Sequence, residues 1–199
     1  MSPLKIGGGV DILHMTLAVP VSELKIIDKL NEDPVKYGLL GFTLAHEMSH
    51  FFDKDGWFRF SNKHNMREQK MKCIERQYNN TITTDDDFAD ISGVEIAYRA
   101  LENKLGKKTM KRPVAKGHNF TNEQVFFISF AHHWCKKKEE LGKEIGNTHS
   151  PGDLRTLNPL RNSDAFAKAF HCPAGSPMNP FKKCRIWTKP DHDIILWLL

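Results

Sequence analysis

Apolar runs separated by polar turns divide the chain into a series of predicted helices. The main apolar run, Tyr37 to Phe52, follows Pro34, and proline favours the first turn of a helix, so a helix is expected from Pro34 to about Asp53. An apolar stretch from Val10 to Pro20 predicts one strand. Apolar residues at helical spacing predict further helices at about 22–30, 62–78, 85–105 and 122–135. The expected fold class is therefore mainly α with a small strand element.

Two helix starts have capping signals. Thr84 or Asp85 is a candidate cap for the helix that ends near Leu105. Thr121 and Gln124 form the Ser/Thr-x-x-Glu/Gln pattern of a capping box, ahead of an aromatic stretch that predicts a buried helix.

The pattern His-Glu-x-x-His lies inside the main apolar run, as His46, Glu47 and His50. Residues four apart share one face of a helix, so the two imidazoles can point at one ion. Neutral imidazoles suit zinc, and a carboxylate beside an open coordination position can take a proton from water. The simpler alternative is a pair of solvated or separately buried histidines. An apolar helix that would hold the rings rigidly favours the metal site.

Asp86 and Asp90 are also four apart and fall in the first turns of the next long helix. A zinc site with two histidines needs a third protein ligand, and Asp86 is the candidate. Asp90 is a candidate acceptor for the second nitrogen of a zinc-bound imidazole. Acidic residues in a first turn can also simply complement the helix dipole.

Further along, His149 and Arg155 are expected on or near a loop, where they could donate to a developing oxyanion.

Composition narrows the class of protein. The 199 residues are 40% hydrophobic and 27% charged, which describes a globular chain. The net charge of +5 comes from dispersed lysines and arginines, a pattern that disfavours nucleic-acid binding. No signal-peptide pattern is present, and the final apolar stretch 194–199 is too short to span a bilayer, so no transmembrane segment is expected.

The four cysteines, Cys73, Cys135, Cys172 and Cys184, have none of the close spacings of a cysteine zinc site. Two disulfides are possible in an oxidising compartment, and their connectivity is open. Glycosylation sequons at 79–81 and 119–121 also favour an oxidising, extracellular compartment. The sequence favours an extracellular origin.

An ordered series of motifs resembles the C-terminal catalytic part of the neprilysin and endothelin-converting-enzyme family of zinc metallopeptidases. The resemblance runs from about Tyr37 to Trp187 and rests on 45–50, 86–90, 121–127, 149–152, 176–180 and 182–187. It implies a zincin-like, thermolysin-like gluzincin fold. One zinc ion would be held by His46, His50 and the first acidic residue of the second helix, Asp86, with Asp90 matching the aspartate that follows.

The same resemblance assigns the catalytic groups and the substrate class. Glu47 matches the general base for a zinc-activated water, His149 the transition-state histidine and Arg155 the arginine that binds a substrate carbonyl. The implied function is a zinc metalloendopeptidase that cleaves peptides on the amino side of an apolar residue, at the extracellular face of the plasma membrane or beyond it. The alternative is a catalytically impaired or inactive homologue that acts as a peptide or protein binding module.

Several features depart from the family pattern. Asp86 stands where relatives have glutamate, so its carboxylate reaches zinc only if the second helix approaches closely or a water intervenes. The Asn-Ala-Tyr/Phe motif expected upstream of the zinc helix is not found within 1–20, and a long N-terminal lid region is absent from this chain. The predicted organisation is a divergent segment at 1–33, the catalytic part at 34–187 and an unmatched tail at 188–199.

The resemblance also bears on the cysteines. Cys73 and Cys184 match a pair that is bonded within the catalytic part, which implies that disulfide. Cys135 and Cys172 match cysteines that bond to the absent region, so they are either free or paired with each other.

Overall fold

The computed structural model describes residues 9–11, 13–19, 21–53, 64–79, 82–135 and 149–187. The tail at 188–199, residues 1–8 of the N-terminal segment, residues 62–63 of a predicted helix and sequon residues 80–81 lie outside this part. Within it the protein is mainly helical with one small sheet, as expected. The main helices are α1 (Val21–Ile27), α2 (Asp33–Lys36), α3 (Phe42–Ser49), α5 (His64–Tyr78), α6 (Thr84–Leu105), α7 (Lys107–Met110), α8 (Asn122–His132), α9 (Gly152–Asn162) and α10 (Asp164–Ala169).

The predicted helix over 34–53 is present, but its backbone changes type along its length. It consists of α2, a π-helical turn η1 (Tyr37–Gly41), α3 and a 3₁₀ turn η2 (His50–Phe52). Gly38 lies in the π turn, where a Cβ would come within 2.5 Å of the Phe126 carbonyl oxygen of α8. The absence of a side chain therefore lets this segment pack directly against the backbone of α8.

The single strand expected at 10–20 is wrong, because the segment folds as a hairpin. Strands β1 (Gly9–Asp11) and β2 (Thr16–Ala18) pair antiparallel, with Val10 opposite Leu17. The Asp11 carboxylate accepts hydrogen bonds from the backbone N–H groups of Leu13 (3.0 Å) and His14 (3.1 Å). This side chain turns the backbone inside an otherwise apolar stretch, which hid the turn from the hydrophobic pattern.

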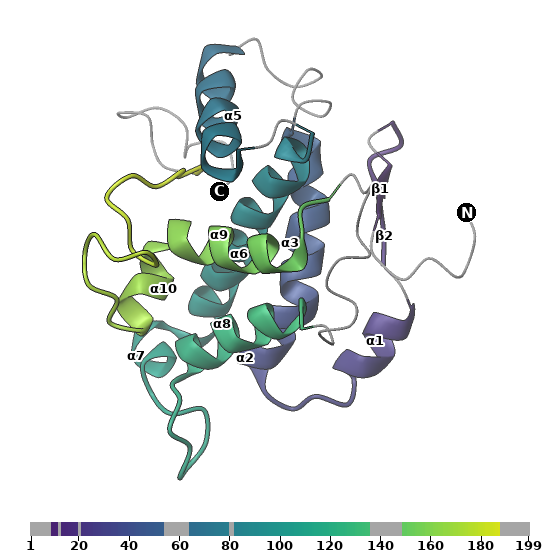
Figure 1. The fold of residues 1–199 in the computed structure, drawn as a ribbon. Helices are drawn as coiled ribbons and strands as arrows, with labels where there is room; N and C mark the ends of the chain where they lie inside the picture. The colour runs from purple at the N-terminus through teal and green to yellow at the C-terminus, as the bar shows by residue number, and fades with distance from the viewer. Residues whose placement is uncertain are drawn as a thin grey trace.

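The main core lies where α3 and α6 pack side by side, with α8 and α9 lying across them (Figure 1). Its fully buried aromatic side chains are Phe42 from α3 and Phe126, Phe127 and Phe130 from α8. Large buried rings of this kind dominate the hydrophobic stabilisation of a small core. The capping box predicted at Thr121 and Gln124 fixes the start of α8.

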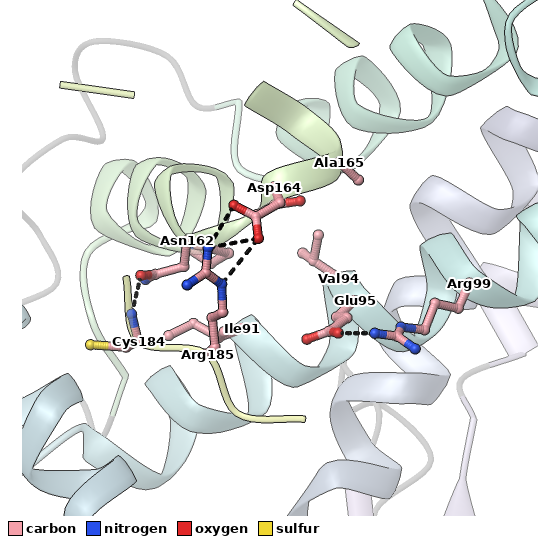
Figure 2. A pocket seen from close by; sticks show the side chains of 11 residues that line it. Ile91, Val94, Glu95, Arg99, Asn162, Asp164, Ala165, Cys184 and Arg185 are labelled. Atoms are coloured by element: carbon pink, nitrogen blue, oxygen red, sulfur yellow. Dashed lines mark hydrogen bonds and ion pairs between the residues drawn. The ribbon is translucent and has the colours of Figure 1, made fainter. Parts of the chain in front are cut away.

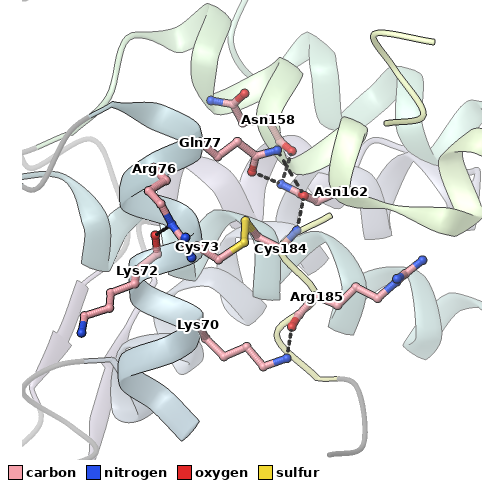
Figure 3. Close-up of a disulfide and its surroundings, with 9 residues drawn as sticks. All are labelled: Lys70, Lys72, Cys73, Arg76, Gln77, Asn158, Asn162, Cys184 and Arg185. Atoms are coloured by element: carbon pink, nitrogen blue, oxygen red, sulfur yellow. Dashed lines mark hydrogen bonds between the residues drawn. A yellow bond between two sulfur atoms is a disulfide. The ribbon is translucent and has the colours of Figure 1, made fainter. Parts of the chain in front are cut away.

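A second, smaller core joins α5 to the start of α6 and to the C-terminal segment around Cys184. The implied disulfide between Cys73 and Cys184 is present, with a Cα–Cα distance of 5.7 Å (Figure 3). Asn162 lies beside it and accepts a hydrogen bond from the Cys184 backbone N–H at 2.7 Å. Cys135 and Cys172 are both free thiols, so the alternative in which they pair with each other does not hold.

The described residues include no helix that combines the length and the apolar character needed to cross a membrane.

Candidate metal centre

Helix α3 and the 3₁₀ turn η2 that continues it present two histidines, His46 and His50, one turn apart on the side that faces α6. The Nε2 atoms of His46 and His50 are 3.2 Å apart, and His46 is buried. The two helices approach closely because α6 has Gly93 at the contact, where a Cβ would lie 3.0 Å from the backbone nitrogen of His46. The lack of a side chain at Gly93 thus brings the first turn of α6 to the histidines.

Asp86 comes from that first turn and completes a cluster whose ligand atoms all lie within 4.8 Å of one another. Its Oδ1 atom is 3.5 Å from His46 Nε2 and 4.0 Å from His50 Nε2. A point equidistant from these three atoms lies about 2.1 Å from each, which is the usual length of zinc bonds to imidazole nitrogen and carboxylate oxygen. The shorter aspartate therefore reaches without an intervening water.

The same Asp86 oxygen is buried and faces three histidine nitrogens, but it makes no aligned hydrogen bond among the described residues. A buried carboxylate oxygen that lacks an aligned hydrogen bond is costly unless a positive charge balances it. The donor set of two imidazoles and one carboxylate is also a known ligand combination of catalytic zinc. The residues that are present therefore fit a zinc ion.

Two further carboxylates contact the outer nitrogens of the histidines. Asp90 Oδ1 is 2.8 Å from His46 Nδ1, although this short contact is not aligned as a hydrogen bond, and Asp53 Oδ2 is 2.7 Å from His50 Nδ1. Such contacts fix the orientation of an imidazole and increase its basicity. Asp90 was a sequence candidate for this position. Asp53 was missed, although it lies three residues after His50 at the end of the same helical segment, within reach of that ring.

The electrostatics of the site favour a positive charge. Burial alone would lower the pKa of His46, but the adjacent Asp86 and Asp90 carboxylates outweigh it and raise that pKa to about 9. Burial would raise the pKa of Asp90, but Arg155 and His46 hold it below its usual value. The raised pKa favours a proton on the His46 imidazole. A metal ion would have to displace this proton to bind there.

The remaining sequence candidates lie around this cluster. Glu47 follows His46 in α3 and is partly buried. His149 precedes α9, and its Nε2 atom is 3.3 Å from Asp86 Oδ1. Arg155 lies in α9 itself, not on the loop that the sequence suggested. The guanidinium binds both oxygens of Asp90 at 2.7 Å and lies 4.0 Å from the centroid of the Trp134 ring.

A separate cavity of about 200 Å³ lies between α6, the α9–α10 junction and the C-terminal segment (Figure 2). Ile91 and Val94 form part of its apolar lining, and Asp164 and Arg185 pair with each other at its edge. None of the zinc-site residues lines this cavity, so the two sites are distinct.

Comparison with known proteins identifies the family of this chain. The family model described as Peptidase family M13 matches residues 59–186. The chain belongs to peptidase family M13. This match begins after His50, so the assignment does not depend on the two histidines. The chain also superposes on a zinc metalloprotease of Mycobacterium tuberculosis with a TM-score of 0.80, at 21% identity over 94% of this chain and 33% of that one, so the two share a fold.

Curated M13 relatives are more similar in sequence. Neprilysin-2 of Caenorhabditis elegans is 36% identical over 179 residues, which cover 77% of this chain and 24% of the relative. Endothelin-converting enzyme 1 of Bos taurus is 32% identical over 176 residues, which cover 77% and 23% respectively. The chain thus spans about a quarter of the length of the curated relatives that it matches.

Proposed function

We propose that this chain carries the metal centre of a zinc metalloendopeptidase of the neprilysin type, with one zinc ion held by His46, His50 and Asp86. The single observation that carries the proposal is the convergence of these three ligand atoms, one of them a buried carboxylate oxygen that makes no aligned hydrogen bond. When bound, zinc supplies a Lewis acid that acidifies water and polarises a carbonyl oxygen.

The protein groups around that site divide the remaining work. Asp90 and Asp53 hold the two imidazoles through their outer nitrogens. Glu47 accepts the proton of the attacking water and later delivers it to the leaving amine, as a general base and then a general acid. His149 donates to the oxyanion that develops on the substrate carbonyl, beside Asp86.

Arg155 is held ready by Asp90 and by the face of Trp134. The two bonds to Asp90 and the contact with the Trp134 ring hold the planar guanidinium in a fixed, buried position. A guanidinium held in this way is well placed to donate to a substrate carbonyl. Membership of a peptidase family supports peptides as the substrates. The disulfide between Cys73 and Cys184 and the membership of family M13 support an extracellular location.

The decisive experiment combines zinc analysis with a Glu47→Gln substitution. We expect about one zinc per chain in both proteins, because Glu47 is not a ligand, and loss of nearly all peptide cleavage in the variant. Glu102→Gln, at the far end of α6 from Asp86, is the matched control and keeps full activity. Undiminished cleavage by Glu47→Gln would refute the assignment of the base. A wild-type chain that binds zinc and peptides but cleaves none is instead the binding module.

A further inference from the structure

Three buried polar side chains connect the start of α6 to the loop that carries His149. Thr83, Asp87 and Ser150 are 4%, 0% and 4% exposed. Thr83 Oγ1 donates to Asp87 Oδ2 at 2.8 Å and lies 2.9 Å from Ser150 Oγ. The Ser150 hydroxyl also hydrogen-bonds the Asp87 carboxylate. Carboxylate oxygens only accept, so both hydroxyls converge on Asp87 and the three side chains form one hydrogen-bonded group.

This arrangement uses the hydroxyl of a helix cap for another purpose. Thr83 is the N-cap residue of α6, but its side chain makes no bond to a backbone N–H of the first turn. A threonine at this position usually caps the helix with its hydroxyl. Here the hydroxyl instead contacts the loop before α9, which is 67 positions away in sequence.

The start of α6 and the loop before α9 contact each other through two pairs of consecutive residues. Asp86 and Asp87 are consecutive on α6, and His149 and Ser150 are consecutive on the loop. His149 Nε2 is 3.3 Å from Asp86 Oδ1, and Ser150 bonds into the neighbouring pair of Thr83 and Asp87. The His149 side chain is 52% exposed, whereas the anchor of its chain neighbour is fully enclosed.

We propose that the hydrogen-bonded group of Ser150, Thr83 and Asp87 positions His149 beside the Asp86 carboxylate. Thr83, Asp87 and Ser150 are then positioning residues, which act through His149 and touch no substrate. The inference rests on the proposed peptidase function for its kinetic part. Its structural part, the anchoring of the loop, does not depend on catalysis.

The kinetic test uses Ser150→Ala and Thr83→Val in the full chain. We expect kcat to fall about tenfold in each, a part of what the loss of an oxyanion donor costs, with KM and zinc content unchanged. Thr83→Ser retains the hydroxyl and keeps wild-type kcat. Ser150→Ala added to His149→Ala causes no further loss, because the group that it positions is already gone. Independent, multiplicative losses in this double variant would overturn the proposal.

A matched control separates positioning from general destabilisation. Ser92 is a fully buried serine of α6 whose hydroxyl has no partner among the described residues. Ser92→Ala removes the same atom without touching the anchor and is expected to leave kcat unchanged. A similar loss of kcat in Ser92→Ala and Ser150→Ala would show a merely structural effect and overturn the proposal.

Amide hydrogen exchange tests the anchor without any activity. In Ser150→Ala, exchange over residues 149–155 should accelerate at least tenfold, while exchange in α8 (122–132) stays as in the wild type. Unchanged exchange over 149–155 would overturn the anchoring. Faster exchange over 149–155 in a chain that cleaves no peptide would support the anchor and count against the peptidase function, so the two failures are distinguishable.

Discussion

The close approach of α3 and α6 gives a sharp prediction for Gly93→Ala. A Cβ at this position would lie 3.0 Å from the His46 nitrogen, 3.1 Å from its Cα and 3.2 Å from the Phe42 ring. Two of these atoms are backbone, so the contact is relieved by separating the helices by about 0.4 Å, to an ordinary distance. Metal–ligand distances tolerate only about 0.2 Å. Asp86 comes from α6, and the histidines come from α3 and the turn η2 that continues it, so the separation acts directly on the ligand set.

The magnitude follows from opposing effects. Overpacking costs about 1–3 kcal/mol, and alanine gains about 1 kcal/mol over glycine in a helix, so stability should fall by about 0–2 kcal/mol. The effect on zinc affinity should be clearer than the effect on stability. We expect affinity to fall about 10–100-fold, which is the usual result of removing a contact that orients a metal ligand.

The assay is competition for zinc against a chromogenic chelator, with thermal unfolding of the apo protein measured in parallel. Gly41→Ala is the matched control, because its Cβ would meet only the Tyr37 side chain at 3.4 Å, an ordinary contact. Its zinc affinity should stay within a factor of about 2 of the wild type. Wild-type zinc affinity in Gly93→Ala would refute the view that close helix approach lets the short Asp86 side chain reach the metal.

Three further predictions concern one contact of the proposed metal site and two features of the fold away from it. Asp53→Asn should lower zinc affinity about 10–100-fold, measured by the same competition, because the amide is a weaker acceptor for His50 Nδ1. Hydrogen bonds from Lys183 and Arg185 outweigh burial and lower the pKa of Asp164, so its stabilising effect is present above the unfolded pKa and lost as pH falls through the folded one. The difference in melting temperature between the wild type and Asp164→Asn should therefore shrink between about pH 7 and about pH 2, and a constant difference would contradict this. Cys73→Ala should reduce the free energy of unfolding by about 2–5 kcal/mol in denaturant titrations, because the disulfide closes a loop with a sequence separation of 111.

Sequence periodicity predicted the longer helices up to residue 135, missed α7, α9 and α10, and gave little information on how the helices contact one another. His46 and His50 share a face because of their spacing alone, which any α-helix would ensure. Whether Asp86 meets them depends on how α6 packs against α3, and that contact is set by the missing side chain of Gly93, which no periodicity records. The disulfide was reached through family resemblance, because four cysteines without close spacings leave the pairing open.

Other features were missed for local reasons. Asp11 turns the N-terminal hairpin inside an apolar stretch, and Asp53 falls just beyond the motif that drew attention to the helix. The bond between Thr83 and Ser150 joins two hydroxyls that are 67 positions apart, and serine and threonine are too common for such a pair to stand out. Polar contacts across a core need coordinates, because they follow from packing and not from pattern.

The proposed metal ligands come from a short part of the fold. They lie on α3, the 3₁₀ turn η2 that follows it, and α6, and the Asp90 carboxylate beside His46 also comes from α6. These helices pack against each other in the main core, with Phe42 one turn before His46 and buried against Phe130. The ligand geometry is therefore set by the same contacts that stabilise the core. Metal binding should accordingly persist as long as this core is folded, whereas the grip on a peptide depends on the surfaces that surround it.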